Sequence, residues 1–347
     1  YSRYYIPEML LTTLTFAVIV CGNRYGHTRK PGWALAAGAS LGLMFATKET
    51  AGIAACCMVA AWMLTQRPLR RPAWPVLAGL VIAALIPIVV LGPQNIVTAI
   101  LSYSQRAIGE QVYRQPLHYY SELLLWSPII CVLAVVGGIR ARDALTRFLA
   151  VYSCAMLIAY SAIPYKTPWC LLSILQPMLV LGGAGLASLL QARDKLLCGV
   201  LAASIGVLAI QAWQESYPDA CDPRNPYVYG HTTRDVFEIR DAVNRVARAN
   251  PEGRDIAIQV VSGKNLWPLS WYLREFRHIQ WWSRIGPGFH PAEVIVATPE
   301  MEPGLIHEIY EVPPPGQREL YVPLFDRQVE LRPQVEVRGY VRASLAR

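Results

Sequence analysis

The stretch VLAGLVIAALIPIVVL, residues 76–91, decides the fold class, because it is continuously apolar and carries no charged side chain. A helix that crosses a bilayer needs about 17–25 mainly apolar residues, so this run is close to one full span. The whole chain shares the bias: 54% of its residues are hydrophobic and 16% are charged, against about a quarter charged in soluble domains. The sequence therefore predicts an α-helical protein that crosses a membrane several times.

Similar apolar runs recur up to Trp213, and charged residues become dense from Gln214 onward. We expect residues 1–213 to form a transmembrane domain of about eight spans, and residues 214–347 to form a soluble domain. The second and third runs are short enough to form one re-entrant hairpin instead. The eight runs are Ile6–Cys21, Gly32–Thr47, Thr50–Leu64, Val76–Leu91, Leu123–Ile139, Phe148–Ile163, Trp169–Leu190 and Leu196–Trp213.

Basic residues divide the loops of the membrane half into two alternating sets. The loops near residues 24–30, 67–71, 140–147 and 193–195 hold 11 Lys and Arg, whereas the other set holds five. Lys and Arg accumulate on the cytoplasmic side, so we expect the first set to face the cytoplasm. The chain is thus predicted to be a multi-pass protein of the cell membrane with an extracytoplasmic C-terminal domain. Chemistry is expected at the outer face, where the glutamates of the membrane half lie: Glu8, Glu49, Glu110 and Glu122.

The net charge of +8 comes from the membrane half, which holds 16 Lys and Arg against 6 Asp and Glu. The C-terminal part holds 16 against 18 and is slightly acidic. It therefore lacks the basic face by which proteins bind nucleic acid, and nucleic acid is excluded as a partner. Membrane lipid is the expected partner, and the sequence identifies no protein partner.

The C-terminal part has the pattern of a small α/β domain. Residues 233–249 place apolar side chains at helical spacing, with Thr233 as the expected cap. Residues 255–261 and 292–297 predict buried strands joined by a crossover helix over 266–276, and an extended segment follows over 321–342. We expect a mainly parallel sheet. Trp267 and Trp271 fall at helical spacing in the crossover, which favours packing over a sugar platform, although aromatic rings also stack on sugars.

Three strings of the membrane half carry a resemblance to a known superfamily: Arg3–Glu8 (RYYIPE), Gly42–Thr50 (GLMFATKET) and Ile163–Trp169 (IPYKTPW). They resemble the GT-C glycosyltransferases that use polyprenyl-phosphate sugars, such as protein O-mannosyltransferases and the aminoarabinose transferase of lipid A. Together with Gln115–Tyr120, Leu266–Arg274 and Leu331–Glu336, they look like the subgroup of flippase-activity-associated membrane proteins. The resemblance implies a GT-C membrane core with an extracytoplasmic domain. It also implies an acidic loop before Tyr1, so we expect the chain to be truncated at its N-terminus.

The resemblance assigns Glu8 as the candidate catalytic residue, where GT-C proteins use a second acid to bind metal or orient the acceptor, with Arg3 beside it. Favourable placement at a helix N-terminus explains Glu8 equally well. Lys48 and Glu49 interrupt an apolar stretch, and a fixed cation there could hold the lipid phosphate and stabilise it as it departs. A simple ion pair at a hairpin tip is the alternative for Lys48 and Glu49.

Lys166 lies between two prolines at the outer interface, which frees backbone groups around it and favours phosphate binding. A lysine that reaches to the interface beside Tyr165 and Trp169 is the competing interpretation. His118 lies in the long outer loop and could contact a sugar or phosphate, whereas an interfacial aromatic belt explains the tyrosines that follow it.

The leading hypothesis is a membrane glycosyltransferase that moves a sugar from a polyprenyl phosphate to an acceptor hydroxyl at the outer face. A carboxylate base activates the hydroxyl, and lysines, with or without a divalent metal such as Mg²⁺ or Mn²⁺, hold the phosphate. No residue is assigned as a metal ligand. The alternative is a non-catalytic membrane protein that binds lipid-linked sugar and assists its translocation or assembly. An ion-coupled transporter is less favoured, because the charges lie at the span ends rather than at the midplane.

Overall fold

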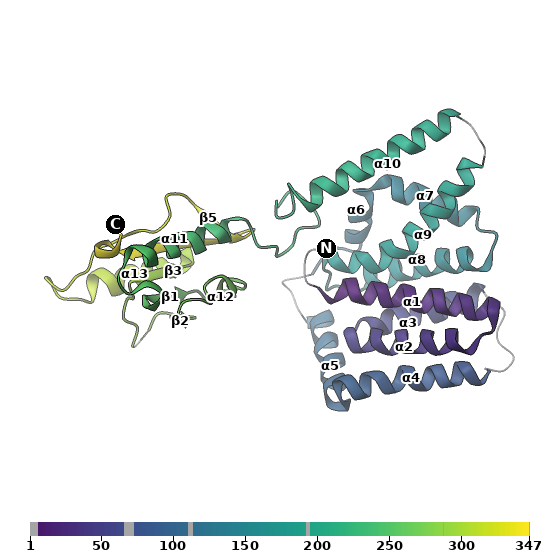
Figure 1. The fold of residues 1–347 in the computed structure, drawn as a ribbon, viewed down its shortest axis with the longest axis horizontal. Coiled ribbons are helices and arrows are strands. Elements are labelled where there is room, and N and C mark those ends of the chain that lie inside the picture. The colour runs from purple at the N-terminus through teal and green to yellow at the C-terminus, as the bar shows by residue number, and fades with distance from the viewer. Residues whose placement is uncertain (1–5, 66–72, 110–113, 192–194, 287, 347) are drawn as a thin grey trace. The chain divides into compact units, whose positions relative to one another are not determined.

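The computed structural model describes residues 6–65, 73–109, 114–191, 195–286 and 288–346. The chain divides into two compact units, Tyr1–Tyr217 and Pro218–Arg347. The first unit is helical and the second contains the sheet (Figure 1).

The helices of the first unit follow the apolar runs, and several begin at a proline, whose missing N–H is not needed in the first turn. They are α1 (Pro7–Thr28), α2 (Pro31–Thr47), α3 (Ala51–Thr65), α4 (Trp74–Leu91), α5 (Pro93–Gly109), α6 (Tyr119–Leu125), α7 (Pro128–Ile139), α8 (Ala144–Ala162), the 3-10 turn η1 (Pro168–Cys170), α9 (Leu171–Leu190) and α10 (Lys195–Ser216).

Each of the eight predicted runs coincides with a helix or a bent helix pair. Four helical segments of the described chain are long and apolar enough to cross a membrane: Trp74–Leu91, Ala144–Ala162, Pro168–Leu190 and Lys195–Ser216. The pair α6 and α7, bent by 99°, adds a fifth if it forms one broken span. The multi-pass membrane architecture is therefore confirmed, with fewer full-length spans than the eight runs predicted. The second and third runs form two separate helices, and α3 is apolar but has only 15 residues.

Glycines allow close helix contacts inside the membrane unit. A Cβ added to Gly38 of α2 would lie 2.1 Å from the carbonyl oxygen of Gly79 in α4. A Cβ on Gly137 of α7 would lie 2.0 Å from the carbonyl oxygen of Leu181 in α9. Helices in lipid associate through such small residues, because burial of apolar surface gives them little driving force. Many large apolar side chains consequently remain on the outside, as on α4 and α10.

The second unit contains four short helical turns of 3-10 or π type besides its regular elements, over Gly253–Asp255, Pro299–Met301, His307–Glu311 and Ala343–Leu345. Its helices and strands are α11 (Asp235–Ala249), β1 (Ala257–Val261), α12 (Leu269–Tyr272), β2 (His278–Trp282), β3 (Val294–Ala297), α13 (Glu302–Ile306), β4 (Tyr321–Pro323), β5 (Val329–Arg332) and β6 (Val335–Arg342). The sheet has the order β2-β1-β3-β6-β4, and β5 also pairs with β6.

The α/β class is confirmed, but the mainly parallel sheet is wrong. Strand β1 pairs in parallel with β2 and β3, whereas β6 is antiparallel to β3, β4 and β5. The extended segment predicted over 321–342 contains three strands, and a tight turn at Gln334 (φ 67°) joins β5 to β6. Such a turn permits antiparallel pairing without a crossover. The predicted crossover helix over 266–276 is a single turn, α12, and β2 follows it.

Both faces of the sheet are covered. Val294 and Val296 of β3 face the core beneath α11 and α12, while Ile295 and Ala297 face the core beside α13. This alternation is the period of two that a strand imposes on its side chains. The amphipathic helix α11 is confirmed, but Thr233 does not cap it: its hydroxyl donates to the carbonyl oxygen of Glu330.

Candidate functional site

Glu8 lies in the first turn of α1 and is buried at 2% exposure. Its Oε1 forms an ion pair with Nζ of Lys48, 40 residues later in the sequence. Its second oxygen, Oε2, is buried and has no hydrogen-bond partner among the residues that the structure describes. A buried carboxylate oxygen without a partner is costly. Oε2 is therefore the atom to which a hydroxyl group would donate.

Lys48 reaches Glu8 because α2 ends at Thr47 and the backbone of Lys48 is extended (φ −160°, ψ 143°). The N–H of Ala51 donates to the Lys48 carbonyl at 3.1 Å, so the turn leads directly into α3. The side chain of Lys48 is 16% exposed, against 3% for Glu8. An ammonium group has three N–H donors, which leaves donors of Lys48 for an anion beside the carboxylate.

Glu49, the next residue of the turn, faces a different partner. Its Oε1 accepts from the guanidinium of Arg106 in α5 at 3.2 Å. Tyr103, one turn earlier in α5, lies near the same pair, and burial raises the pKa of its hydroxyl above the ordinary value. The helix α5 thus adds Arg106 and Tyr103 to this end of the unit.

Sequence reasoning missed this contribution, because it read residues 92–122 as one long loop. The signal for α5 was present as apolar residues at helical spacing. They are Ile96, Val97, Ile100 and Leu101.

Lys166 is buried at 2% exposure in the loop between α8 and η1. Its Nζ donates to the carbonyl oxygens of Ile163 at 2.7 Å and Gln115 at 3.1 Å. The Gln115 N–H in turn donates to the Pro164 carbonyl at 3.1 Å. Burial lowers the pKa of the Lys166 amine from its ordinary value. Lys166 therefore connects two loops through two of its three N–H donors. Phosphate binding by the third N–H stays a prediction.

A second polar group of the membrane unit joins the loop before η1 to α6. The Tyr120 hydroxyl donates to the Thr167 carbonyl at 3.1 Å, and the Thr167 hydroxyl lies 3.3 Å from Sγ of Cys170. Helix α1, which carries Glu8, packs against α2 and against α9, which follows Cys170.

The remaining predicted residues lie differently. His118 precedes α6, and its Nε2 lies 3.2 Å from Glu122, with both side chains about two thirds exposed. The structure thus gives His118 a partner on its own helix rather than Glu8 or Lys48. Arg3 lies outside the described residues.

The site brings one buried carboxylate and one cation together, which suits hydrogen bonding to a hydroxyl and neutralisation of a phosphate. A divalent metal in a protein is generally held by several oxygen or nitrogen ligands. The described parts of the chain contain no group of three or more His, Cys, Asp or Glu that could hold one. The unpartnered oxygen of Glu8 supplies a single ligand.

Comparisons with known proteins concern the family and the fold. Residues 1–92 match the family model described as dolichyl-phosphate-mannose-protein mannosyltransferase, and this segment contains Glu8, Lys48 and Glu49. No curated protein sequence matches the chain.

Two solved structures share the fold. One is ArnT from Cupriavidus metallidurans bound to undecaprenyl phosphate, with a TM-score of 0.58 and 13% identity, covering 99% of this chain and 76% of that one. The other is the same protein in the apo state, with a TM-score of 0.56, 13% identity, and coverage of 99% and 75%. The chain therefore shares the fold of ArnT, and its first 92 residues resemble the mannosyltransferase family, in agreement with the predicted resemblance. Its C-terminal domain contains a small sheet.

Proposed function

We propose that the protein transfers a sugar from a polyprenyl-phosphate donor to an acceptor hydroxyl at the outer face of the membrane. The observation that carries the proposal is the buried Glu8–Lys48 pair with its unpartnered Oε2. The match over residues 1–92 and the fold shared with ArnT, which binds undecaprenyl phosphate in one structure, support it.

In this proposal Glu8 Oε2 accepts a hydrogen bond from the acceptor hydroxyl and orients its oxygen toward the anomeric carbon. A bond forms between that oxygen and the anomeric carbon, and the bond from the carbon to the phosphate oxygen breaks. The electron pair of the broken bond stays on the phosphate, and the hydroxyl proton passes to a carboxylate base. Lys48 stabilises the negative charge that grows on the departing phosphate.

The other predicted residues take supporting places. Lys166 and Arg3 would add positive charge for the lipid phosphate, and Glu49 would hold Arg106 at the edge of the site. His118 would contact the sugar or the phosphate from the outer loop. The C-terminal domain would face away from the cytoplasm, as the loop charges indicate.

The test is transfer of radiolabelled sugar from a series of polyprenyl-phosphate donors by the full-length protein in liposomes. Glu8→Gln keeps the size of the side chain but removes its charge, and we expect the transfer rate to fall by about 10²-fold or more. Glu215→Gln is the matched control, because Glu215 is also a glutamate of the membrane unit, and its hydrogen-bond partners Trp126 and Gln211 are not among the proposed site residues.

Full activity of Glu8→Gln would remove Glu8 from the mechanism. If no donor supports transfer while lipid-linked sugar still binds, the enzyme proposal fails for those donors. The non-catalytic alternative, a protein that binds lipid-linked sugar for translocation or assembly, would then take its place.

A further inference from the structure

The second unit contains a hollow of about 450 Å³ at the carboxyl ends of β1 and β2. Ligands of parallel α/β sheets bind at this end of the strands, and small-ligand pockets have volumes of roughly 300–1,000 Å³. The proposed glycosyl transfer uses none of the residues that line this hollow. Its apolar floor is formed by Val260 of β1 and Leu266 of the following loop.

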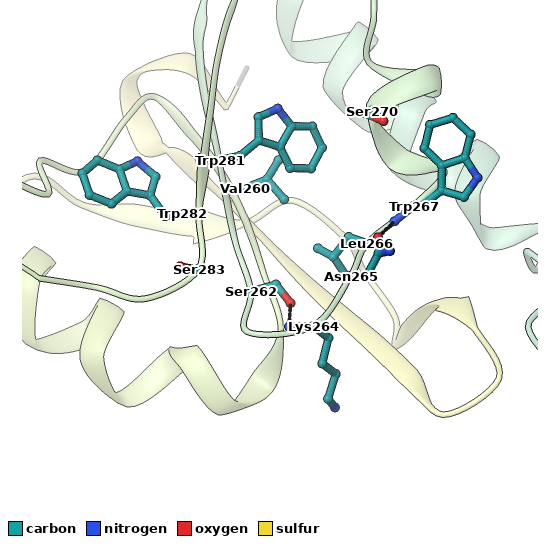
Figure 2. A pocket seen from close by; sticks show the side chains of 10 residues that line it. All are labelled: Val260, Ser262, Lys264, Asn265, Leu266, Trp267, Ser270, Trp281, Trp282 and Ser283. Carbon is teal, nitrogen blue, oxygen red and sulfur yellow. Dashed lines mark hydrogen bonds between the residues drawn. The ribbon is translucent and has the colours of Figure 1, made fainter. Parts of the chain in front are cut away.

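Three tryptophans line it (Figure 2): Trp282 is partly buried against the core cluster beside α13, whereas Trp267 and Trp281 are exposed. Trp281 of the edge strand β2 lies opposite Val260 in the strand register, and Trp267 comes from the loop before α12. Trp267 is 60% exposed and Trp281 is 48% exposed. Burial of an indole ring stabilises the folded protein or a complex, so two half-exposed rings at one hollow indicate a binding surface.

This placement corrects the packing role that the sequence predicted for Trp267 and Trp271. Leu266, Leu269 and Leu273 fill the core of the unit instead. Trp271 is 56% exposed, and the guanidinium of Arg274 lies 4.2 Å from its ring centroid. Trp271 does not line the hollow.

Uncommitted polar groups also line the hollow. The hydroxyls of Ser270 and Ser283 and the amide Nδ2 of Asn265 line the hollow, and none of the hydrogen bonds described within the chain uses them. The other end of the Asn265 amide is fixed, because its Oδ1 accepts from the Trp267 N–H at 2.8 Å. The amide therefore presents its two N–H donors beside the ring of Trp267.

The charge at the hollow favours a neutral ligand. Lys264 extends away from the two indole rings in Figure 2, and its Nζ lies 3.6 Å from Glu300. The cation is thus already paired. A sugar ring matches the remaining surface, because its C–H face packs on an indole ring while its hydroxyls pair with hydroxyl and amide groups.

We propose that this hollow binds a neutral saccharide, with one sugar ring against Trp267 or Trp281 and its hydroxyls on Asn265, Ser270 and Ser283. The proposal goes beyond glycosyl transfer and does not depend on it. The domain would hold a glycan whether the membrane unit is an enzyme or a binding protein.

The test is calorimetric titration of the full chain in lipid nanodiscs with soluble tetrasaccharides of glucose, mannose, galactose, xylose and N-acetylglucosamine. At least one should bind with a Kd of about 1 mM or below, and Trp267→Ala and Trp281→Ala should each weaken that binding about tenfold or more. Asn265→Asp should weaken it too, because it keeps the acceptor for the Trp267 N–H and removes the amide donors. Trp271→Ala is the matched control and should bind as the unmodified chain does.

Three outcomes would overturn the proposal: no binding to any of the five tetrasaccharides, equal binding by the Trp267→Ala and Trp281→Ala variants, or equal weakening by Trp271→Ala. Near-ultraviolet circular dichroism shows whether each variant is folded. Should either alanine variant unfold, Ser270→Ala and Ser283→Ala decide, since these exposed hydroxyls have no structural partner among the described residues.

Discussion

Replacing one partner of the Glu8–Lys48 pair at a time separates its structural role from its chemical one. Each single replacement leaves a charged group in a buried place without its counter-ion, which costs about 3–5 kcal/mol in proteins. The two halves are not equivalent, because the Glu8 side chain is 3% exposed and that of Lys48 is 16% exposed. We therefore expect Glu8→Gln and Lys48→Met to differ.

Glu8→Gln leaves an ammonium group that reaches some water, so we expect a loss near 3 kcal/mol. Lys48→Met leaves a carboxylate whose Oε2 already lacks a partner, so we expect a loss near 5 kcal/mol. One kcal/mol shifts the melting temperature of a 150–250-residue domain by about 2–4 °C. The expected decreases are about 6–12 °C for Glu8→Gln and about 10–20 °C for Lys48→Met. The double variant removes both charges and should regain most of the loss.

The assay is thermal unfolding in detergent, followed by a dye that reacts with cysteine thiols as they become accessible. Cys21, Cys57 and Cys170 are buried in the membrane unit and report its unfolding. Sugar transfer is measured on the unmodified protein, the two single variants and the double variant. If the pair acts in chemistry, the double variant is stable and still fails to transfer sugar.

Equal stability losses for the two single variants, or a larger loss for Glu8→Gln, would refute the reasoning from exposure. Recovery of both stability and transfer in the double variant would show that the pair serves only the fold.

Three further predictions concern other parts of the chain. Gly137→Ala should destabilise the membrane unit by about 1–3 kcal/mol, because its Cβ would lie 2.0 Å from the Leu181 carbonyl oxygen. Gly183→Ala is the control: its Cβ meets nothing within 4 Å, so thermal unfolding should be unchanged. Lys166→Met should cost about 2–4 kcal/mol, because two partly buried carbonyl oxygens lose their donor, and thermal unfolding measures this too. Burial lowers the pKa of His231 to about 4, so as the pH falls the unfolded chain takes up the proton before the folded chain does. The second unit should therefore lose stability as the pH falls from about 6.5 to 4. Urea unfolding followed by tryptophan fluorescence measures this loss.

Each of these three predictions has an outcome that would contradict it. Equal melting temperatures for the two alanine variants would show that α7 and α9 separate without cost. An unchanged melting temperature for Lys166→Met would show that its two hydrogen bonds do not hold the loops. His231→Gln should reduce the loss of stability between pH 6.5 and 4, and an equal loss in that variant would assign it to other groups.

The sequence by itself determined the features that depend on local composition. Charge-free runs such as residues 76–91 have one stable environment, the bilayer, so the membrane class follows without any contact being known. Helical spacing over residues 233–249 likewise determined α11 and its buried face. Lys48 and Lys166 were found because charged groups beside apolar runs are costly and therefore conspicuous, whereas Glu8 was assigned through the resemblance to GT-C glycosyltransferases.

Only the tertiary structure decided which of these groups meet. The Glu8–Lys48 pair joins residues 40 positions apart, and the Arg106–Glu49 pair joins residues 57 positions apart. No local pattern encodes these pairs, because they depend on how α1, α2 and α5 pack. The tertiary structure also left Trp267 exposed, since Leu266 and Leu269 fill the core beside it. Helical spacing shows which residues share a face, and only packing decides which faces are buried.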